Sequence, residues 1–299
     1  MRRIAVINQK GGVGKTTTTV NLAAALAAAG KRVCVLDLDP QAHATTHLGV
    51  EPDGTLPSLY DVLVSNKPLA QVRRQVGDNL WVVPSDIDLA AAEVELAGIV
   101  GREVILREAM AADPEAFDFV LMDCGPSLGV LTLNALAAAD EVFIPLQPHF
   151  LALHGLGKLL ETTALVGRRI NPGVKVGGVV VCLYDAATKL AQEIVTDVKA
   201  FLEQGRAANV PWAAAKVFET KIRRNVKLAE CPSFGKPIFA YAPKSSGAAD
   251  YTALACEVMG IAPPPPVVVG PVRMTVDVPE CPVEARMAGA VPESAGGVA

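Results

Sequence analysis

Residues 9–17 read Gln-Lys-Gly-Gly-Val-Gly-Lys-Thr-Thr and separate an apolar run, residues 3–8, from an alanine-rich stretch, residues 15–29. The run predicts a buried β-strand, and the stretch predicts a helix that ends at Gly30. A strand, a glycine-rich turn and a helix in this order direct backbone N–H groups and the positive end of the helix dipole toward one point. The segment therefore predicts a phosphate-binding loop, or P-loop, in an α/β fold.

The residue types of this loop fit a nucleotide with magnesium. Glycines allow close backbone approach and positive φ angles. Lys15 is expected to reach the β and γ phosphates, and the Thr16 hydroxyl is expected to bind magnesium. The predicted nucleotide-binding residues of the loop are Gly11, Gly12, Val13, Gly14, Lys15, Thr16 and Thr17.

Lys10 makes the loop unusual. The common pattern is G-x-x-x-x-G-K-[ST], but the position five before Gly14 is Gln9, and Lys10 replaces a neutral residue. A second lysine beside Lys15 is unfavourable unless a further negative charge is close, and an ATP shared with a second subunit would supply it. The alternative is a glycine-rich turn with incidental lysines. The coincidence of three glycines, two lysines and tandem threonines with a strand and a helix disfavours that alternative.

Two further apolar runs end in carboxylates. Asp37 and Asp39 stand two residues apart at the end of one run and point to the same side of a strand, and Asp123 ends another run. Strands of a parallel sheet end at the same edge, where ligands bind. We therefore expect all three carboxylates beside the P-loop, where magnesium and an attacking water each need one.

Apolar runs alternate with alanine- and leucine-rich stretches along the chain, as in β-α units. Most runs are continuously apolar, which is typical of strands covered by helices on both faces. We therefore predict a P-loop NTPase fold with a mostly parallel, twisted sheet and helices on both faces. The predicted strands are 3–8, 32–37, 80–83, 117–123, 141–146, 176–183 and 216–220. The predicted helices are 15–29, 89–100, 102–112, 130–138, 156–170, 190–204 and 249–259, with a short helix and a loop within 55–75.

Composition limits the class of protein. The 299 residues are 51% hydrophobic and 19% charged, which indicates a globular protein with a large core. No run of about 18 apolar residues occurs, and the N-terminal run is too short for a signal sequence, so we predict a soluble cytoplasmic protein with no membrane partner. The net charge of −4 argues against a surface that is basic throughout, so any DNA contact must use a local patch.

Cysteine and histidine spacing offers little for a metal. No two of the six cysteines are in C-x-x-C spacing, which favours free thiols. His43 and His47 are four residues apart and would share a helix face as metal ligands. Without a further ligand at matching spacing, we interpret them as polar loop residues.

The composition changes at Ala262. Residues 262–299 contain eight prolines, and their two arginines are outnumbered by four acidic residues. We predict an ATPase domain over 1–261 and a disordered, proline-rich tail over 262–299. Such a tail suits neither a basic DNA-binding arm nor an amphipathic membrane helix.

On these motifs the sequence resembles the ParA/Soj group of chromosome and plasmid partitioning ATPases, in the deviant Walker A class that includes MinD. The resemblance spans about residues 1–260. It rests on residues 10–17, 37–41, 123–127 and 225–230, with Pro232 and Ser233. It implies slow ATP hydrolysis, an ATP-dependent homodimer, a ParB-like activator protein and association with the nucleoid.

The resemblance also assigns catalytic roles. Lys10 would reach the ATP of the partner subunit, whereas Lys15 would hold phosphate in its own subunit. Asp39 would orient the hydrolytic water, with Asp37 nearby. Asp123 would act on magnesium through water or Thr16. The predicted catalytic residues are Lys10, Lys15, Asp37 and Asp39, and the predicted magnesium residues are Thr16, Asp39 and Asp123.

The resemblance further implies non-specific DNA binding near the C-terminal end of the domain. Residues 216–244 hold seven basic and two acidic residues, a local net charge of +5. We predict Arg223, Arg224 and Lys227 as DNA contacts, and the alternative is a solvated surface. Where the family usually has Ile-Pro-Arg-Asn, this chain has Ile-Arg-Arg-Asn at 222–225, which leaves open what the proline does for adenine packing.

Three alternatives share the nucleotide site. Related ATPases position a carboxysome, a chemoreceptor array or a flagellum, and the sequence does not distinguish these cargoes from DNA. A MinD-like ATPase would position itself on a membrane, which the tail disfavours. An iron–sulfur carrier would need bridging cysteines, and only Cys124 lies near the nucleotide edge, where it is more simply a small core residue.

Overall fold

The alternating runs form one eight-stranded sheet in the computed structural model, which describes residues 1–52, 54 and 56–262. The strand order is β3-β4-β2-β5-β1-β6-β7-β8. All pairs are parallel except β3 with β4. The strands are β1 (Arg2–Val6), β2 (Val33–Leu38), β3 (Arg74–Gly77), β4 (Leu80–Val83), β5 (Phe119–Cys124), β6 (Glu141–Leu146), β7 (Lys175–Val181) and β8 (Lys216–Val217).

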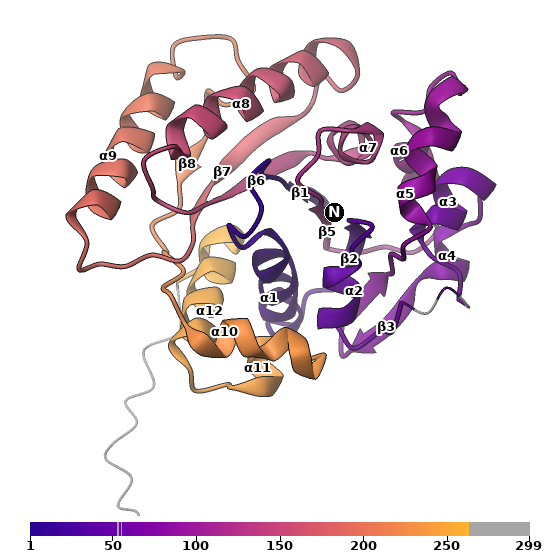
Figure 1. Ribbon diagram of the computed structural model, residues 1–299, viewed down its shortest axis with the longest axis horizontal. Coiled ribbons are helices and arrows are strands. Elements are labelled where there is room, and N and C mark those ends of the chain that lie inside the picture. The colour runs from indigo at the N-terminus through magenta and orange to yellow at the C-terminus, as the bar shows by residue number, and fades with distance from the viewer. Residues whose placement is uncertain (53, 55, 263–299) are drawn as a thin grey trace, which may run out of the picture. The chain divides into compact units, whose positions relative to one another are not determined.

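Helices cover both faces of this sheet (Figure 1). One face carries α1 (Lys15–Ala28), α2 (His43–His47), α10 (Val226–Glu230), η2 (Cys231–Phe234), α11 (Ile238–Tyr241) and α12 (Ser246–Met259). The other face carries α3 (Leu59–Ser65), α4 (Leu69–Val72), α5 (Leu89–Glu95), η1 (Leu96–Gly98), α6 (Ile105–Ala112), α7 (Val130–Ala138), α8 (Ala152–Arg169) and α9 (Lys189–Gln204). The predicted fold class is confirmed.

The two covered faces explain why the strands are continuously apolar. Successive strand side chains point to opposite faces, so both sets must be apolar where both faces are buried. In β2, Val33 and Val35 join the core beneath α1, while Cys34 and Leu36 join the core on the other face. By the same alternation, Asp37 lies on the face of α1.

The sheet register brings the carboxylates to the P-loop. Asp123 on β5 stands opposite Val6 at the end of β1 and also opposite Asp37 on β2. The chain leaves β1 after Val6 to form the loop, so both aspartates lie at the strand edge where the loop begins. The expected convergence at the carboxyl edge of the sheet is confirmed for these two residues.

Several elements differ from the sequence prediction. β3 pairs antiparallel with β4 at the sheet edge, and its half-exposed residues gave no apolar run from which to predict it. The last predicted strand, 216–220, contains only the two-residue β8. Residues 226–241 form α10, η2 and α11, which are too short to show helical periodicity. The predicted tail lies outside the described residues, apart from Ala262.

Candidate active site

The P-loop has the backbone that its glycines predict. Gly12 and Gly14 have φ angles of 74° and 92°, in the left-handed region that favours glycine. α1 begins at Lys15 without a side-chain cap and without an acidic residue in its first turn. The first N–H groups of this 14-residue helix therefore remain available, together with about half a positive charge from the helix dipole. Such a helix start binds an anion.

Lys15 lies inside the loop. Its side chain is buried, and Nζ donates to the backbone oxygen of Lys10 at 3.2 Å. Burial lowers the pKa of Lys15, and the negative charges of Asp123 and Asp39 oppose that shift. This buried ammonium makes a single hydrogen bond, so its other N–H groups can donate to phosphate oxygens.

Asp123 is held by two threonines of α1. The Thr16 hydroxyl donates to Oδ2 at 2.7 Å, and the Thr19 hydroxyl donates to Oδ1 at 2.9 Å. Complete burial raises the pKa of Asp123 to about 7, and repulsion from Asp37 adds to the shift. The arrangement fixes the hydroxyl of Thr16, the residue that the sequence predicts to bind magnesium. The sequence did not identify Thr19, because its contact with Asp123 joins residues that are 104 positions apart.

Asp37 is fully buried, and its carboxylate accepts hydrogen bonds from the segment that follows it. Oδ2 accepts from the backbone N–H and the hydroxyl of Thr45, at 2.8 and 2.7 Å, and Oδ1 accepts from the Asp39 N–H at 3.2 Å. Burial raises its pKa to about 6. These bonds favour a positioning role for Asp37, in which it holds the segment between Asp39 and Thr45, over direct contact with water.

Asp39 reaches the surface of the site. It is 9% exposed and lines a cavity of about 450 Å³ together with the P-loop. Its Oδ1 accepts from the Gln41 N–H at 3.0 Å. The carboxylate lies beside Gly125 of the segment after β5, where a Cβ would be 3.4 Å from Asp39 Cγ, an ordinary van der Waals contact. Asp39 is therefore accessible to a water molecule in the cavity, as its predicted role requires.

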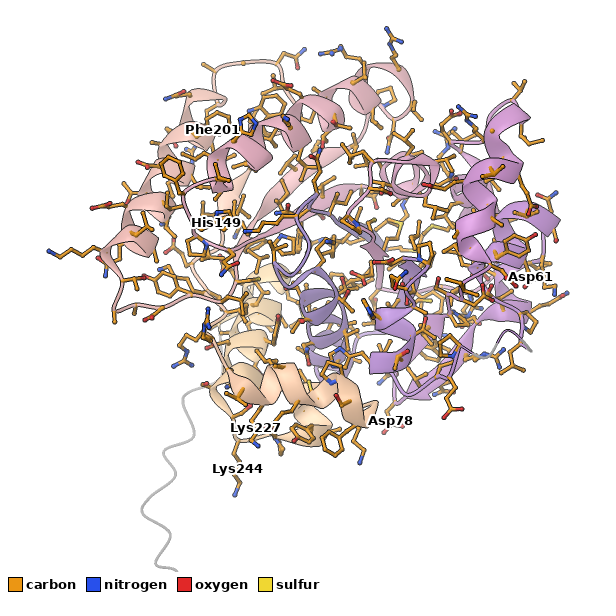
Figure 2. All side chains as sticks on the ribbon, viewed as in Figure 1. Asp61, Asp78, His149, Phe201, Lys227 and Lys244 are labelled. Atoms are coloured by element: carbon orange, nitrogen blue, oxygen red, sulfur yellow. The ribbon has the colours of Figure 1, made fainter. Side chains whose placement is uncertain are left out.

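Lys10 is not among the residues that line the cavity with Lys15. Lys10 is exposed, and its Nζ lies 2.6 Å from Nε2 of His149, on the segment between β6 and α8 (Figure 2). Burial lowers the pKa of His149, and the charge of Lys10 adds to this. Sequence reasoning missed His149, because 139 residues separate it from Lys10.

A second part of the cavity wall comes from residues that are distant from the P-loop in sequence. It is formed by the end of β7, the segment before α10, α10 itself and α12. The residues that line it are Cys182, Leu183, Ile222, Arg223, Asn225, Leu228, Ala229 and Tyr251. The donors of the P-loop and the apolar side chains of this wall together suit the phosphates and the base of a nucleotide. The sequence did not identify the adenine-binding residues, and the residues of this wall are the candidates.

The basic patch is less charged than the sequence indicates. Arg223 pairs with Asp250 at 2.6 Å, Lys216 with Glu257 at 3.3 Å, and Lys227 with Glu230 at 2.8 Å. Asp250 and Glu257 belong to α12, outside the counted window, so the value of +5 overstates the local charge. Figure 2 shows Lys227 and Lys244 beside α10 and α11, at the edge of the molecule in this view. Arg224 is exposed and has no ion pair among the described residues.

The two histidines are not loop residues, contrary to the sequence interpretation. His43–His47 is the short helix α2, and His47 is 1% exposed, with Nε2 3.3 Å from the Sγ of Cys231. Within the described part of the chain, no three His, Cys, Asp or Glu side chains form a metal site. Five cysteines there are free and buried, and Cys124 is a core residue as predicted.

Comparisons with known proteins agree with this geometry. Residues 1–176 match the family model described as an AAA domain. The sporulation initiation inhibitor protein Soj of Bacillus subtilis is 44% identical over 256 residues, which cover 85% of this chain and 97% of that protein. The chromosome-partitioning ATPase Soj of Thermus thermophilus is 46% identical over 259 residues, covering 87% and 96%. The chain belongs to the Soj/ParA family of partitioning ATPases.

A solved structure has a similar fold to that of this partitioning ATPase. Cobyrinic acid a,c-diamide synthase from Mycobacterium smegmatis, with a bound ATP analogue and magnesium, is 36% identical and has a TM-score of 0.72. The likeness covers 87% of this chain and 94% of that one. Its name concerns a different product, so the fold does not by itself determine the task. No helix among the described residues is long and apolar enough to cross a membrane.

Proposed function

We propose that this partitioning ATPase forms a homodimer when ATP binds, that the dimer binds DNA without sequence specificity, and that hydrolysis, accelerated by a ParB-like partner, resets it at the nucleoid. One observation carries the proposal. Lys10 is exposed and lies outside the residues that line its own cavity, although that cavity already contains Lys15 and Thr16. An exposed loop lysine that does not line its own cavity supports a role for Lys10 in the cavity of a second subunit.

The residues fit ATP and Mg²⁺, the cofactors of this site. Thr16 and Asp39 present oxygen atoms, which magnesium prefers, and Asp123 holds the Thr16 hydroxyl in place. Within the described ranges no three His, Cys, Asp or Glu side chains gather as a metal site, and phosphate oxygens and water would supply the remaining magnesium ligands. Bound magnesium would neutralise charge on the β and γ phosphates.

The chain's own residues divide the remaining work. The amides of the P-loop and of the first turn of α1 orient the phosphates, and Lys15 neutralises part of their charge. Asp39 orients the attacking water from the side of the segment after β5. We expect a slow intrinsic rate, because Asp39 orients the water and is not itself a strong general base. A partner that improves the position of Asp39 would increase it.

Size-exclusion chromatography with a non-hydrolysable ATP analogue tests the dimer. Lys10→Ala should bind the analogue as a monomer, while the wild type dimerises. Lys31→Ala is a matched control, because Lys31 lies past the opposite end of α1 and should dimerise normally. A Lys10→Ala protein that dimerises like the wild type would refute the role of Lys10 across the interface. Asp39→Ala should accumulate as an ATP-bound dimer, and normal turnover by that variant would remove Asp39 from the mechanism.

DNA binding is tested by comparing ATP, ADP and no nucleotide. We propose Arg224 as the principal contact, because it is exposed and has no ion pair among the described residues. Lys227 contributes less to DNA binding, because its ion pair with Glu230 offsets its positive charge. Log K for DNA binding falls as log salt concentration rises, and each phosphate contact makes that slope steeper by about 0.9. Arg224→Ala should therefore weaken retention and flatten that slope, and unchanged retention at low salt would place the DNA surface elsewhere.

A further inference from the structure

Hydrogen bonds on both sides of its Cα hold the backbone of Asp39. The Asp39 N–H donates to Oδ1 of Asp37 at 3.2 Å, and the Asp39 carbonyl oxygen accepts from Oγ of Ser85 at 2.7 Å. The same carbonyl oxygen also accepts from the Ala42 N–H at 2.9 Å. These contacts fix both peptide groups that flank Asp39, and with them the direction in which its carboxylate leaves the backbone.

Thr45 joins Ser85 to Asp37. The Ser85 N–H donates to Oγ1 of Thr45 at 2.9 Å, and the Thr45 hydroxyl donates in turn to Oδ2 of Asp37 at 2.7 Å. Together with Asp39, these three residues form a closed ring of hydrogen bonds in which one hydroxyl both donates and accepts. The three are at most 1% exposed, so water does not compete for the bonds of the ring.

The sheet explains how Ser85 reaches Asp39. β2 and β4 run parallel with Leu36 opposite Val83, so the chain leaves both strands at the same edge. Asp39 follows β2 directly, and Ser85 comes two residues after β4. Asp39 lines the nucleotide cavity, whereas Ser85 is not among the residues that line it. Ser85 is therefore placed to affect a bound nucleotide through Asp39.

The turn between Asp39 and Thr45 contains a strained residue. Ala42 has a φ angle of 52°, in the left-handed region that residues with a Cβ rarely adopt. Such strain persists only where the surrounding contacts impose it, and it is often found at functional sites. Both ends of this turn belong to the hydrogen-bonded ring. A break in the ring would let the turn relax and Asp39 move with it.

We propose that Ser85 is a positioning residue for ATP hydrolysis, whose hydroxyl keeps the Asp39 carboxylate where it orients the attacking water. The inference rests on the proposed function, in which Asp39 has that role. Orientation of water depends on distance and angle, and a displacement of about 1 Å can slow a reaction about a hundredfold. The P-loop and Lys15 bind the phosphates without contact to the ring, so the ring supports hydrolysis and not ATP affinity.

Single-turnover ATP hydrolysis and ATP affinity, measured in parallel on the full chain, test this role. Ser85→Ala removes only the hydroxyl and leaves the Asp39 carbonyl oxygen with the Ala42 N–H, so the variant should fold. Its hydrolysis rate should fall about tenfold to a hundredfold, while its ATP affinity stays within about twofold of the wild type. A matching loss of ATP affinity would overturn the inference.

Ser58→Ala is the matched control. Its hydroxyl is also buried, and Oγ accepts from the Tyr60 N–H at the start of α3, away from Asp39. This variant should hydrolyse ATP at the wild-type rate. A loss in Ser58→Ala as large as that in Ser85→Ala would show that the loss of any buried serine hydroxyl slows the enzyme, and it would overturn the specific role of Ser85.

Thr45 allows the same ring to be broken at a second place. Thr45→Val keeps the shape of the side chain but has no hydroxyl, so it should slow hydrolysis as Ser85→Ala does. Thr45→Ser keeps the hydroxyl and should restore the rate. If Thr45→Ser is as slow as Thr45→Val, the hydroxyl of the ring is not what hydrolysis requires, and the inference fails.

A double variant separates this inference from the proposed function. Asp39→Ala with Ser85→Ala should hydrolyse ATP no more slowly than Asp39→Ala alone, because Ser85 acts only through Asp39. A further loss in the double variant, or wild-type rates in both Ser85→Ala and Thr45→Val, would overturn the role of Ser85. A wild-type rate in Asp39→Ala would instead refute the proposed function.

Discussion

Asp37→Asn should remove part of the pH dependence of stability in the nucleotide-free protein. Asp37 is fully buried with a pKa raised to about 6, from an ordinary value of 3.8. The folded chain therefore binds a proton more tightly than the unfolded chain does. Stability from this group is fully present below pH 3.8 and is lost as the pH rises through about 6.

The magnitude follows from the two pKa values. Linkage gives a wild-type free energy of unfolding that is higher at pH 5 than at pH 8, with a contribution from Asp37 on the order of 1 kcal/mol. Asparagine resembles the protonated acid, so it keeps the acceptor for Thr45 but cannot ionise. The difference between pH 5 and pH 8 should therefore shrink by about 1 kcal/mol in Asp37→Asn.

Urea unfolding at pH 5 and pH 8, with EDTA to remove magnesium, measures this difference. Asp78→Asn is the control, because it removes the same chemical group from an exposed turn and should keep the wild-type difference. If Asp37→Asn retains the full wild-type pH dependence, burial of Asp37 is not what destabilises the protein at neutral pH. The pH dependence would then come from other carboxylates at the end of the sheet, such as Asp123.

Three more variants test the site and the fold. Lys15→Gln should abolish ATP binding, measured by equilibrium titration, because the loop then lacks its buried cation. Arg73→Met should cost about 3–5 kcal/mol in urea unfolding, because it leaves Asp113 buried without its partner, and a cost below 1 kcal/mol would contradict this. Gly247→Ala should lower stability by about 1 kcal/mol, because the new Cβ would lie 2.8 Å from Cγ of Leu228, and an increase in Tm would show that Leu228 can move away.

The sequence could predict the phosphate end of the site because that end is local. Strand, glycine turn and helix are contiguous, so spacing alone places Gly14 and Lys15 and requires the φ angles that the structure shows. Continuous apolar runs likewise predicted a parallel sheet covered on both faces, because burial of alternate side chains on two faces requires them. Asp37 and Asp123 were also predictable, since parallel strands end at one edge.

Tertiary structure decided the contacts between residues distant in sequence. Lys10 meets His149 across 139 residues, and Arg223 meets Asp250 across 27. No local pattern predicts either pair, because the acceptor lies on another element and its side chain bears no periodic relation to the donor. The counted charge of residues 216–244 was misleading for the same reason, since neutralising carboxylates come from α12. Sequence by itself determined the chemistry of the loop, and packing decided which charges remain free to act.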